Sequence, residues 1–365
     1  MREINVNVTV RPVSYRLVIG SDLMDIIADE LAKHPLGRRY AIITDTTVAP
    51  LWAEKLEAAF SSAGLSFDRF VFPAGEENKT RAVKEQLENA MMAAHYGRDA
   101  AVVALGGGVV GDIAGFVAAT YMRGLPVIQI PTTTLAMADS SIGGKTAVDT
   151  PYGKNLIGAF HHPSVVYMDM DILKTLDERN YRNGLAELIK HGFIRDPELL
   201  DFVESHVSQI DDRDNECLEK LFTMNCRVKN DIVSEDEKEA GIRQILNYGH
   251  TMGHAVEMAS GLSLLHGECV AIGMAFASQI AVRKGICSSW WQNRQNQIIG
   301  AMGLPAEVPS CMDADKLIEL MRMDKKSRDG EFRFVLPVAP GKVAFGVPVS
   351  EEEIREALEE TRAAL

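Results

Sequence analysis

The chain has 365 residues, of which 46% are hydrophobic and 24% are charged, a balance typical of a globular enzyme with room for two domains. Its formal net charge of -13 argues against a nucleic-acid partner, because that binding depends on basic patches that neutralise phosphates. The sequence has no apolar signal region and no run long enough to span a membrane, and its five cysteines form no C-x-x-C pair, so we expect a reduced, cytoplasmic protein without a membrane partner.

The first half of the chain alternates apolar strands with amphipathic helices. The first two strands, Ile4–Val10 and Tyr15–Ile19, are expected to be antiparallel. The elements that follow are strands at Tyr40–Thr44, Phe70–Phe72, Ala101–Leu105 and Val127–Ile130, with helices near Val48–Ala63, near Thr80–His95 and from Val109. This alternation indicates a parallel sheet that is covered by helices on both faces, and the strand at Val127–Ile130 closes the series.

The second half of the chain is dominated by helical periodicity, from Arg179 to Met323. A short hairpin, Phe332–Pro337 and Lys342–Val347, and a charged helix near Glu351–Ala364 finish the chain. We therefore predict an α/β domain with a Rossmann-like parallel sheet over residues 1–174, and an all-α domain over residues 175–365. Because no flexible linker separates them, the two halves should pack tightly, with a cleft between them.

A glycine-rich turn joins a buried strand to a helix in the first half. Leu105 ends the strand, and Gly106-Gly-Gly-Val-Val-Gly-Asp112 opens the helix. Consecutive glycines let the backbone approach a pyrophosphate, and a helix N-terminus supplies free N–H groups and the positive end of a dipole. The sequence is not the G-x-G-x-x-G fingerprint, so a tight strand-to-helix turn without a ligand is the alternative.

Three further loops follow strands of the same predicted sheet. Asp45 follows one strand, Glu76 to Lys79 follow the next, and Thr132 and Thr133 follow a third. Ligands of open α/β sheets bind at the carboxyl ends of the strands, so these loops favour a bound dinucleotide. An acidic residue near the ribose favours NAD over NADP, because it would repel a 2′-phosphate.

The stretch from Thr132 to His162 has no clear periodicity, which is unusual inside a compact domain unless the loop is functional. It carries Asp139, Lys145, Lys154 and Asn155 among several glycines. Lysines in such a loop suit a phosphate or carboxylate, although a solvated surface loop would also accommodate them. Further cationic candidates are Arg123, Lys190, Lys229, Arg243 and Lys326.

Histidines and a carboxylate in the second half have the composition of a catalytic zinc site. Glu187 lies in an apolar helical run, His250 and His254 are four residues apart, and His266 follows. Two or three imidazoles plus one carboxylate, with a position left open, is the ligand set of a catalytic zinc ion. Spacing alone makes His250 and His254 the ligand pair, as in H-E-x-x-H sites. The alternative is a set of ordinary polar residues on solvated helix faces.

Taken in order, these motifs resemble the 3-dehydroquinate synthases, a family of sugar-phosphate cyclases, over nearly the whole chain. The resemblance rests on Gly106-Gly-Gly-Val-Val-Gly-Asp112, Pro131-Thr-Thr, Asp139-Ser-Ser-Ile-Gly-Gly-Lys145-Thr, Gly153-Lys-Asn155, Ala186-Glu-Leu-Ile-Lys190, Asn247-Tyr-Gly-His-Thr-Met-Gly-His254, His266-Gly-Glu268 and Asp324-Lys-Lys326. It implies an NAD-binding α/β domain, a helical metal-binding domain and a homodimer.

The resemblance also implies a role for each motif residue. Zinc or cobalt would be bound by Glu187, His250 and His266, with His254 as a neighbour that contacts substrate or moves protons. NAD would be held by Asp45, Glu76, Lys79, Gly107, Gly108, Val109, Asp112, Thr132 and Thr133, with Lys145 and Lys154 serving both cofactor and substrate. The substrate would be lined by Asp139, Lys145, Asn155, Lys190, Lys229, Arg243, Asn247 and Lys326, with Arg123 and Lys154 near its phosphate. This chain departs from many family members at Val148-Asp-Thr-Pro151, in the loop between the two lysines.

The implied reaction converts 3-deoxy-D-arabino-heptulosonate 7-phosphate to 3-dehydroquinate and phosphate, a step of the shikimate pathway. It proceeds by transient oxidation with NAD, β-elimination of phosphate, re-reduction and intramolecular aldol closure. A sister cyclase of the aminocyclitol or valiolone type, a metal-dependent polyol dehydrogenase and a catalytically inactive NAD-binding regulator are the alternatives. The cationic residues that would bind a carboxylate favour the first interpretation.

Overall fold

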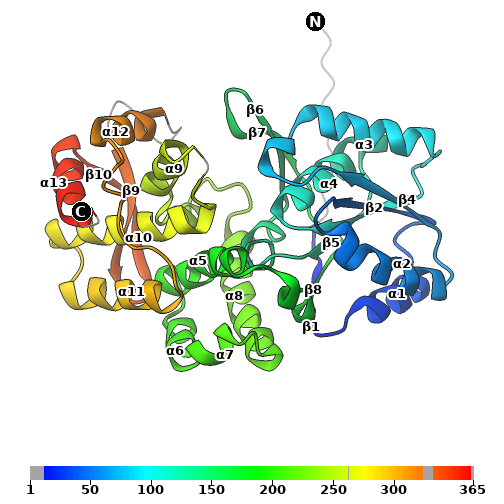
Figure 1. The fold of residues 1–365 in the computed structure, drawn as a ribbon, viewed down its shortest axis with the longest axis horizontal. Helices are drawn as coiled ribbons and strands as arrows, with labels where there is room; N and C mark the ends of the chain where they lie inside the picture. The colour runs from blue at the N-terminus through cyan, green and yellow to red at the C-terminus, as the bar shows by residue number, and fades with distance from the viewer. Residues whose placement is uncertain (1–11, 262, 324–331, 363–365) are drawn as a thin grey trace, which may run out of the picture.

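The computed structural model describes residues 12–261, 263–323 and 332–362. Figure 1 shows the sheet and its helices on one side of the molecule, the mostly helical part on the other, and helices α5 (Glu178–Ile194) and α8 (Asn215–Glu235) between them. None of the helices in these ranges is long and apolar enough to cross a membrane.

The first half is built on a six-stranded sheet with the order β1-β8-β5-β4-β2-β3. The strands are β1 (Arg16–Gly20), β2 (Arg39–Asp45), β3 (Phe67–Phe72), β4 (Ala100–Gly106), β5 (Val127–Pro131) and β8 (Val165–Asp169). All neighbouring strands are parallel, which confirms the predicted parallel sheet. Every residue of β4 is buried, as a central strand covered on both faces requires.

The sheet contains one strand, β8, that was not predicted, and this strand is the neighbour of β1. The strand at Val127–Ile130 does not close the series, because β8, a short buried run from Val165 to Asp169, inserts between β5 and β1. The strand predicted at Tyr15–Ile19 forms as β1, and its neighbour in the sheet is the parallel strand β8. The antiparallel partner predicted at Ile4–Val10 lies outside the described residues.

Helices cover both faces of this sheet. One face packs against α1 (Met24–Lys33) and α2 (Glu54–Ser62), which follows a π-helical turn at Ala49–Ala53. The other face packs against α3 (Arg81–Ala93) and α4 (Gly108–Thr120). Helix α1 was absent from the predicted elements, although Ile27 and Leu31 give it a buried apolar stripe.

The stretch predicted as a loop without periodicity contains a β-hairpin. Strands β6 (Lys145–Thr150) and β7 (Gly153–Phe160) pair antiparallel, after a π-helical turn at Ala136–Ser140. The hairpin packs on α4 so closely that a Cβ added at Gly115 would lie 2.5 Å from Thr146 Cγ2. The loop expectation was wrong because β7 is largely exposed and its apolar residues do not alternate with polar ones.

The second half is mostly helical, as predicted, and ends in the expected hairpin and helix. Beyond α5 and α8 its helices are α6 (Pro197–Ser205), α7 (Val207–Asp211), α9 (His250–Ala259), α10 (His266–Arg283), α11 (Ser289–Ala301), α12 (Ala314–Met323) and α13 (Glu351–Thr361). The hairpin consists of β9 (Phe332–Ala339) and β10 (Lys342–Val349). Helix α10 runs through the middle of this half and is buried along most of its length.

One continuous apolar core joins the two halves, as the lack of a linker predicts. It includes Met24 and Phe60 from α1 and α2 together with Phe193 and Phe276 from α5 and α10. Helix α5 also contacts the backbone of the first half directly, since a Cβ added at Gly184 would lie 2.1 Å from Leu135 N. The cleft expected between the halves stays a prediction.

Candidate active site

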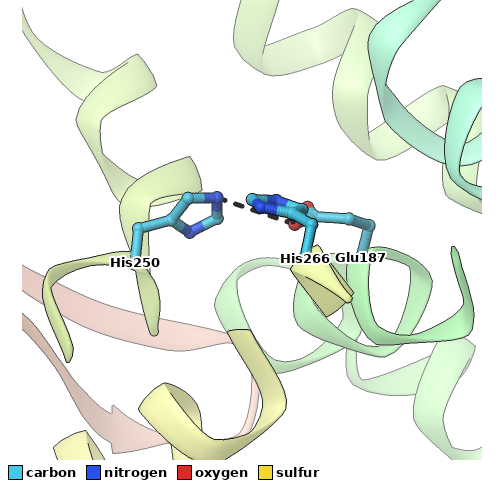
Figure 2. A group of neighbouring side chains, drawn as sticks. All are labelled: Glu187, His250 and His266. Atoms are coloured by element: carbon cyan, nitrogen blue, oxygen red, sulfur yellow. Dashed lines mark ion pairs between the residues drawn. The ribbon is translucent and has the colours of Figure 1, made fainter. Parts of the chain in front are cut away.

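Three helices of the second half bring one carboxylate and two imidazoles together. Glu187 comes from the middle of α5, while His250 and His266 are the first residues of α9 and α10. His250 Nε2 lies 3.6 Å and His266 Nε2 lies 3.4 Å from Glu187 Oε1. One ligand atom from each residue lies within 4.8 Å of the others, and Figure 2 shows both rings directed toward the carboxylate.

The far side of each imidazole is fixed by a second contact. His250 Nδ1 lies 3.1 Å from the carbonyl oxygen of Tyr248, and His266 Nδ1 lies 3.3 Å from Glu257 Oε2. Both partners are acceptors, so each Nδ1 carries a proton and each Nε2 is the nitrogen that faces Glu187. Metal-bound histidines are held in this way by carbonyl or carboxylate partners.

Glu187 has a different environment at each of its two oxygens. Oε2 accepts from Lys190 Nζ, one turn along α5. Oε1 is buried and accepts from no donor among the described residues. A buried carboxylate oxygen without a donor is costly unless a cation or other group satisfies it, so the donor set fits a divalent metal ion.

The pKa values of the three residues suit a cation. Burial opposes charge at Glu187, but Lys190 and the two imidazoles outweigh it and hold the pKa of this carboxyl well below its usual range. Burial lowers the pKa of His250, which keeps its ring neutral. Burial also opposes charge at His266, but Glu187 and Glu257 raise its pKa to about 10, and a metal ion would displace that proton.

His254 lies beside this group. Its ring centroid is 5.2 Å from that of His250 and 6.1 Å from that of His266. Among the described residues, the ligand atoms of Glu187, His250 and His266 lie within 4.8 Å of one another, and His254 does not belong to this group.

A second ion pair lies close to Glu187. Lys229 Nζ, from α8, donates to Asp139 Oδ1 at 2.5 Å and to the carbonyl oxygen of Asp139. Burial raises the pKa of Asp139, but Lys229 outweighs it and the pKa falls below its ordinary value. His191, fully buried on α5, places Nε2 3.9 Å from Asp139 Oδ1.

A third group joins the start of the first hairpin to the turn before α9. Glu239 accepts from Lys145 Nζ and, at 2.6 Å, from Asn247 Nδ2. The guanidinium of Arg243 is buried and donates to the carbonyl oxygen of Glu237, with Gly143 O at 3.4 Å. Several predicted substrate residues are thus neighbours, although they are far apart in sequence.

The four predicted NAD loops follow four neighbouring strands. Strands β5, β4, β2 and β3 are adjacent in that order, so Thr132, Gly107, Asp45 and Glu76 leave the same edge of the sheet. Because these strands are parallel, this edge is where a dinucleotide binds in open α/β sheets.

The glycine turn fits a dinucleotide phosphate. A Cβ added at Gly107 would lie 3.0 Å from Thr133 Cγ2, and one at Gly108 would lie 3.3 Å from Ser140 Oγ. Thr132 Oγ1 is buried without a partner in the described part of the chain, which leaves a hydroxyl available to a ligand. Asp45 Oδ1 accepts from the backbone N–H groups of Thr47 and Val48, both at 2.8 Å, so it also orders its own loop.

Lys79 links the sheet edge to the hairpin. Its buried Nζ donates to Asp112 Oδ2 and to Asn155 Oδ1, both at 2.6 Å. Lys154 Nζ lies 2.6 Å from Glu257 Oε1 and 3.6 Å from Glu76 Oε1. A chain of contacts therefore runs from Glu76, in one of the predicted NAD loops, through Lys154 and Glu257 to His266.

The described contacts do not join Arg123 to this network. Arg123 lies beyond the C-terminal end of α4, in the turn Tyr121–Arg123, and the described contacts connect it to no other predicted site residue. Lys326 lies outside the described residues. Val109, in the first turn of α4, contributes a partly buried side chain to the core on that face of the sheet.

Three residues of the network were missed by the sequence reasoning. Glu257 follows His250 by seven residues and His254 by three, so helical spacing could have placed it on their face of α9. His191 follows Glu187 by four residues and carries the same signal. Glu239 lies in the acidic run from Glu235 to Glu239, which looks like a solvated turn, and no local signal indicates its role.

The chain is similar to known proteins over most of its length. Residues 69–183 match the family model for the 3-dehydroquinate synthase N-terminal region, and residues 184–327 match the model for the C-terminal region. A 3-dehydroquinate synthase of Symbiobacterium thermophilum is 46% identical over 95% of this chain and 98% of its own length. Another, from Nostoc punctiforme, is 42% identical over 97% of this chain and 98% of its own length.

Solved structures give the same fold. The 2-epi-5-epi-valiolone synthase of Streptomyces hygroscopicus, with NAD+ and Zn2+ bound, has a TM-score of 0.89 and 31% identity, covering 98% of this chain and 99% of its own. A 2-deoxy-scyllo-inosose synthase complexed with carbaglucose-6-phosphate, NAD+ and Co2+ has a TM-score of 0.87 and 28% identity, covering 94% of this chain and 96% of its own. With two family models that together span most of its length and relatives of the same name above 40% identity, this chain belongs to the 3-dehydroquinate synthase family.

Proposed function

We propose that the site binds one NAD+ and one divalent metal ion and uses both on a single sugar phosphate. The reaction is that of the family, in which 3-deoxy-D-arabino-heptulosonate 7-phosphate is converted to 3-dehydroquinate and phosphate. When bound, NAD+ would accept and return a hydride, and the metal ion, zinc or cobalt, would acidify the hydroxyl that is oxidised. This makes the chain a carbon–oxygen lyase whose cofactor is regenerated in every cycle.

The observation that carries the proposal is the unpartnered Glu187 Oε1 facing two imidazoles. Each Nε2 lies within 3.6 Å of this oxygen, and no hydrogen-bond donor from the described residues satisfies it. Glu187, His250 and His266 would hold the metal ion and leave its remaining positions to substrate oxygens. Glu257 would orient His266 through Nδ1, as carboxylates do beside metal-bound histidines.

The NAD+ would lie along the sheet edge formed by the loops after β5, β4, β2 and β3. The backbone at Gly107 and Gly108, next to the N-terminus of α4, would receive the pyrophosphate. Asp45 would accept from a ribose hydroxyl. The other proposed cofactor contacts are Glu76, Lys79, Val109, Asp112, Thr132, Thr133, Lys145 and Lys154.

The substrate would lie between the cofactor and the metal, where the cationic residues gather. Lys145, Lys154, Lys229 and Arg243 would bind its phosphate and carboxylate, which fixes the conformer that reacts. The proposed lining also includes Asp139, Asn155, Lys190, Asn247, Arg123 and Lys326. His254, beside both metal-binding histidines, is proposed to carry a proton to or from the substrate, as imidazole commonly does near neutral pH.

The proposal also covers the domain boundary, the oligomeric state and the location of the protein. We place the boundary between the cofactor half and the metal half near residue 174, and we expect the chain to work as a homodimer in the cytoplasm. Light scattering on the purified protein measures the dimer directly. A monomer with full activity would contradict that expectation.

One assay tests the proposed function. Phosphate should be released continuously from the heptulosonate phosphate with catalytic NAD+ present, while the absorbance of NADH stays flat because the hydride returns to the same molecule. NADH that accumulates in step with phosphate would indicate a polyol dehydrogenase instead. A sugar phosphate without a carboxylate is the matched control, and its preferential turnover would indicate a sister cyclase.

A further inference from the structure

Three hydrogen-bond acceptors cluster next to Glu187, His250 and His266 (the metal-type group), and we call this cluster the acceptor pocket. Two of its residues, Asp139 and Glu187, belong to the proposed function, whereas His191 has no role in it. Asp139, Glu187 and His191 each place one ligand-type atom within 4.8 Å of the other two. His191 and Glu187 are at most 1% exposed, and His191 Nε2 and Glu187 Oε1 are both buried without a donor from the described residues. Asp139 is partly exposed, so the pocket is open on its side.

The hydrogen bonds of Asn225 fix which nitrogen of His191 is the acceptor. Asn225 Nδ2 donates to the carbonyl oxygen of Ala138 at 2.9 Å, and that oxygen can only accept. Asn225 therefore turns Oδ1 toward His191 Nδ1, 2.6 Å away, and Oδ1 must accept a proton from it. In the neutral ring this leaves the lone pair on Nε2, which faces the pocket.

The charges around the pocket decide what it binds. Lys229 Nζ already neutralises Asp139, and Lys190 Nζ already neutralises Glu187. A second divalent cation would meet two ammonium groups in addition to the metal ion held by Glu187. Three acceptors with no net charge to offset instead suit a neutral group that donates hydrogen bonds.

The dimensions of the pocket agree with a single oxygen atom. Three atoms no more than 4.8 Å apart leave a point that is at most about 2.8 Å from each of them, which is the usual length of an O–H hydrogen bond. A water placed there has two protons and would satisfy His191 Nε2 and one of the two carboxylates, whereas a hydroxyl has one proton and would satisfy His191 Nε2 alone.

We propose that Asp139, Glu187 and His191 form a binding site for one hydroxyl donor, either a water molecule or a hydroxyl of the substrate, and that His191 positions it. The proposal rests on the proposed function only in placing substrate nearby. His191 contributes a fixed acceptor at Nε2, while Asn225 holds the ring through Nδ1. The donor is thereby held next to the metal ligand Glu187, where the reacting hydroxyl of the substrate is expected.

A crystal structure of the metal-loaded protein, with and without a bound substrate-shaped inhibitor, tests the site directly. The proposal requires an oxygen in hydrogen-bond contact with His191 Nε2. An oxygen present in both structures identifies a water, and one present only with the inhibitor identifies a substrate hydroxyl. An anomalous metal peak in the pocket, or no oxygen in either structure, would overturn the proposal.

Two variants of His191 test the acceptor at Nε2 separately from the donor at Nδ1, which contacts Asn225. His191→Gln keeps an acceptor near the Nε2 position, whereas His191→Asn keeps a donor near Nδ1 and loses the acceptor. We expect kcat/KM to fall about 5- to 100-fold in His191→Asn, because a buried hydrogen-bonding partner is left unsatisfied. In His191→Gln most of that loss should be recovered. Metal content, measured by elemental analysis, should equal that of the wild type in both.

The outcomes also distinguish this inference from the proposed function. Equal losses in both variants would mean that His191 acts only through packing, and unchanged kinetics in His191→Asn would mean that it does not act at all. In either case the wild-type protein would still release phosphate, so the proposed function would stand while the inference fails. Circular dichroism confirms that each variant is folded before its kinetics are compared.

Discussion

Glu187 is arranged so that one carboxylate oxygen is paired with a lysine while the other stays available. Lys190, three residues later on the same helix, donates only to Oε2, so it fixes the carboxylate while leaving Oε1 toward the two histidines. Both groups are buried, and the loss of either partner of such a pair strongly destabilises the folded protein. The spacing of three residues therefore serves orientation as well as charge balance.

The first prediction concerns which histidines bind the metal. His250→Ala and His266→Ala should lose bound metal, whereas His254→Ala should retain it and lose turnover. The physical reason is coordination number, because Glu187 and two histidines would give three protein ligands and a fourth would close the site to substrate. Elemental analysis of the three variants measures this. A metal-free His254→Ala beside a metal-replete His266→Ala would contradict the assignment.

The second prediction concerns the cysteines, all five of which are free. Burial raises the pKa of Cys226 and of Cys269 to about 12, so almost none of either thiol is ionised at neutral pH. Cys217 and Cys287 are also buried, while Cys311 is exposed. One thiol per chain should react rapidly with a thiol reagent at about pH 8, and Cys311→Ser should abolish that reaction. Rapid reaction of several thiols in the native protein would contradict the buried environment.

At the scale of whole elements, the metal-type group depends on the close approach of α9 and α10. A Cβ added at Gly273, on α10, would lie 1.8 Å from the carbonyl oxygen of Gly249, directly before α9. A Cβ at Gly253 would lie 2.9 Å from the carbonyl oxygen of Cys269. Glycines on both helices thus set the distance between the helix that begins at His250 and the one that begins at His266.

The third prediction follows from this contact. Gly273→Ala should destabilise the protein by about 1–3 kcal/mol, because the methyl group overpacks against backbone that has no room to move. It should also weaken metal binding, since α9 carries His250 away from His266. Gly300→Ala on α11 is the matched control, because no atom lies within 4 Å of its added Cβ, and it should stabilise the helix slightly. Equal melting temperatures for the two variants would show that α9 and α10 are not tightly packed.

The elements also show what the sequence could and could not predict. Strands β2, β4 and β5 were found because buried apolar runs alternate with helices, a pattern that also predicts a parallel sheet. The hairpin β6–β7 was missed because the apolar residues of its exposed strand do not alternate with polar ones. Strand β8 was missed because its five residues follow that hairpin rather than a helix. The partners of the site residues, such as Glu239 beside Lys145, depend on tertiary contacts between segments that are distant in sequence.

At the scale of the whole molecule, lysines gather at the candidate site although the net charge is negative. The chain carries a formal charge of -13, yet Lys190 of α5 lies beside Glu187, Lys229 of α8 beside Asp139 and Lys154 of the hairpin beside Glu257. Each of these lysines is paired with a carboxylate in the absence of ligand, including Lys154 with Glu257 across the two halves. An anionic substrate would therefore exchange these contacts for its own, which is how an acidic protein can bind a phosphorylated acid.

The last prediction concerns stability when the metal is removed. Glu187, His250 and His266 come from α5, α9 and α10, so a metal ion that binds only the folded chain stabilises it by mass action. With free metal at a hundredfold excess over Kd, this amounts to about 2.7 kcal/mol, and a chelator should lower the melting temperature accordingly. In Glu187→Gln the chelator should have little effect, while added NAD+ should still raise the melting temperature because the cofactor edge of the sheet is intact. If the chelator lowered the melting temperature of Glu187→Gln as much as that of the wild type, the stabilising ion would have to lie elsewhere in the protein.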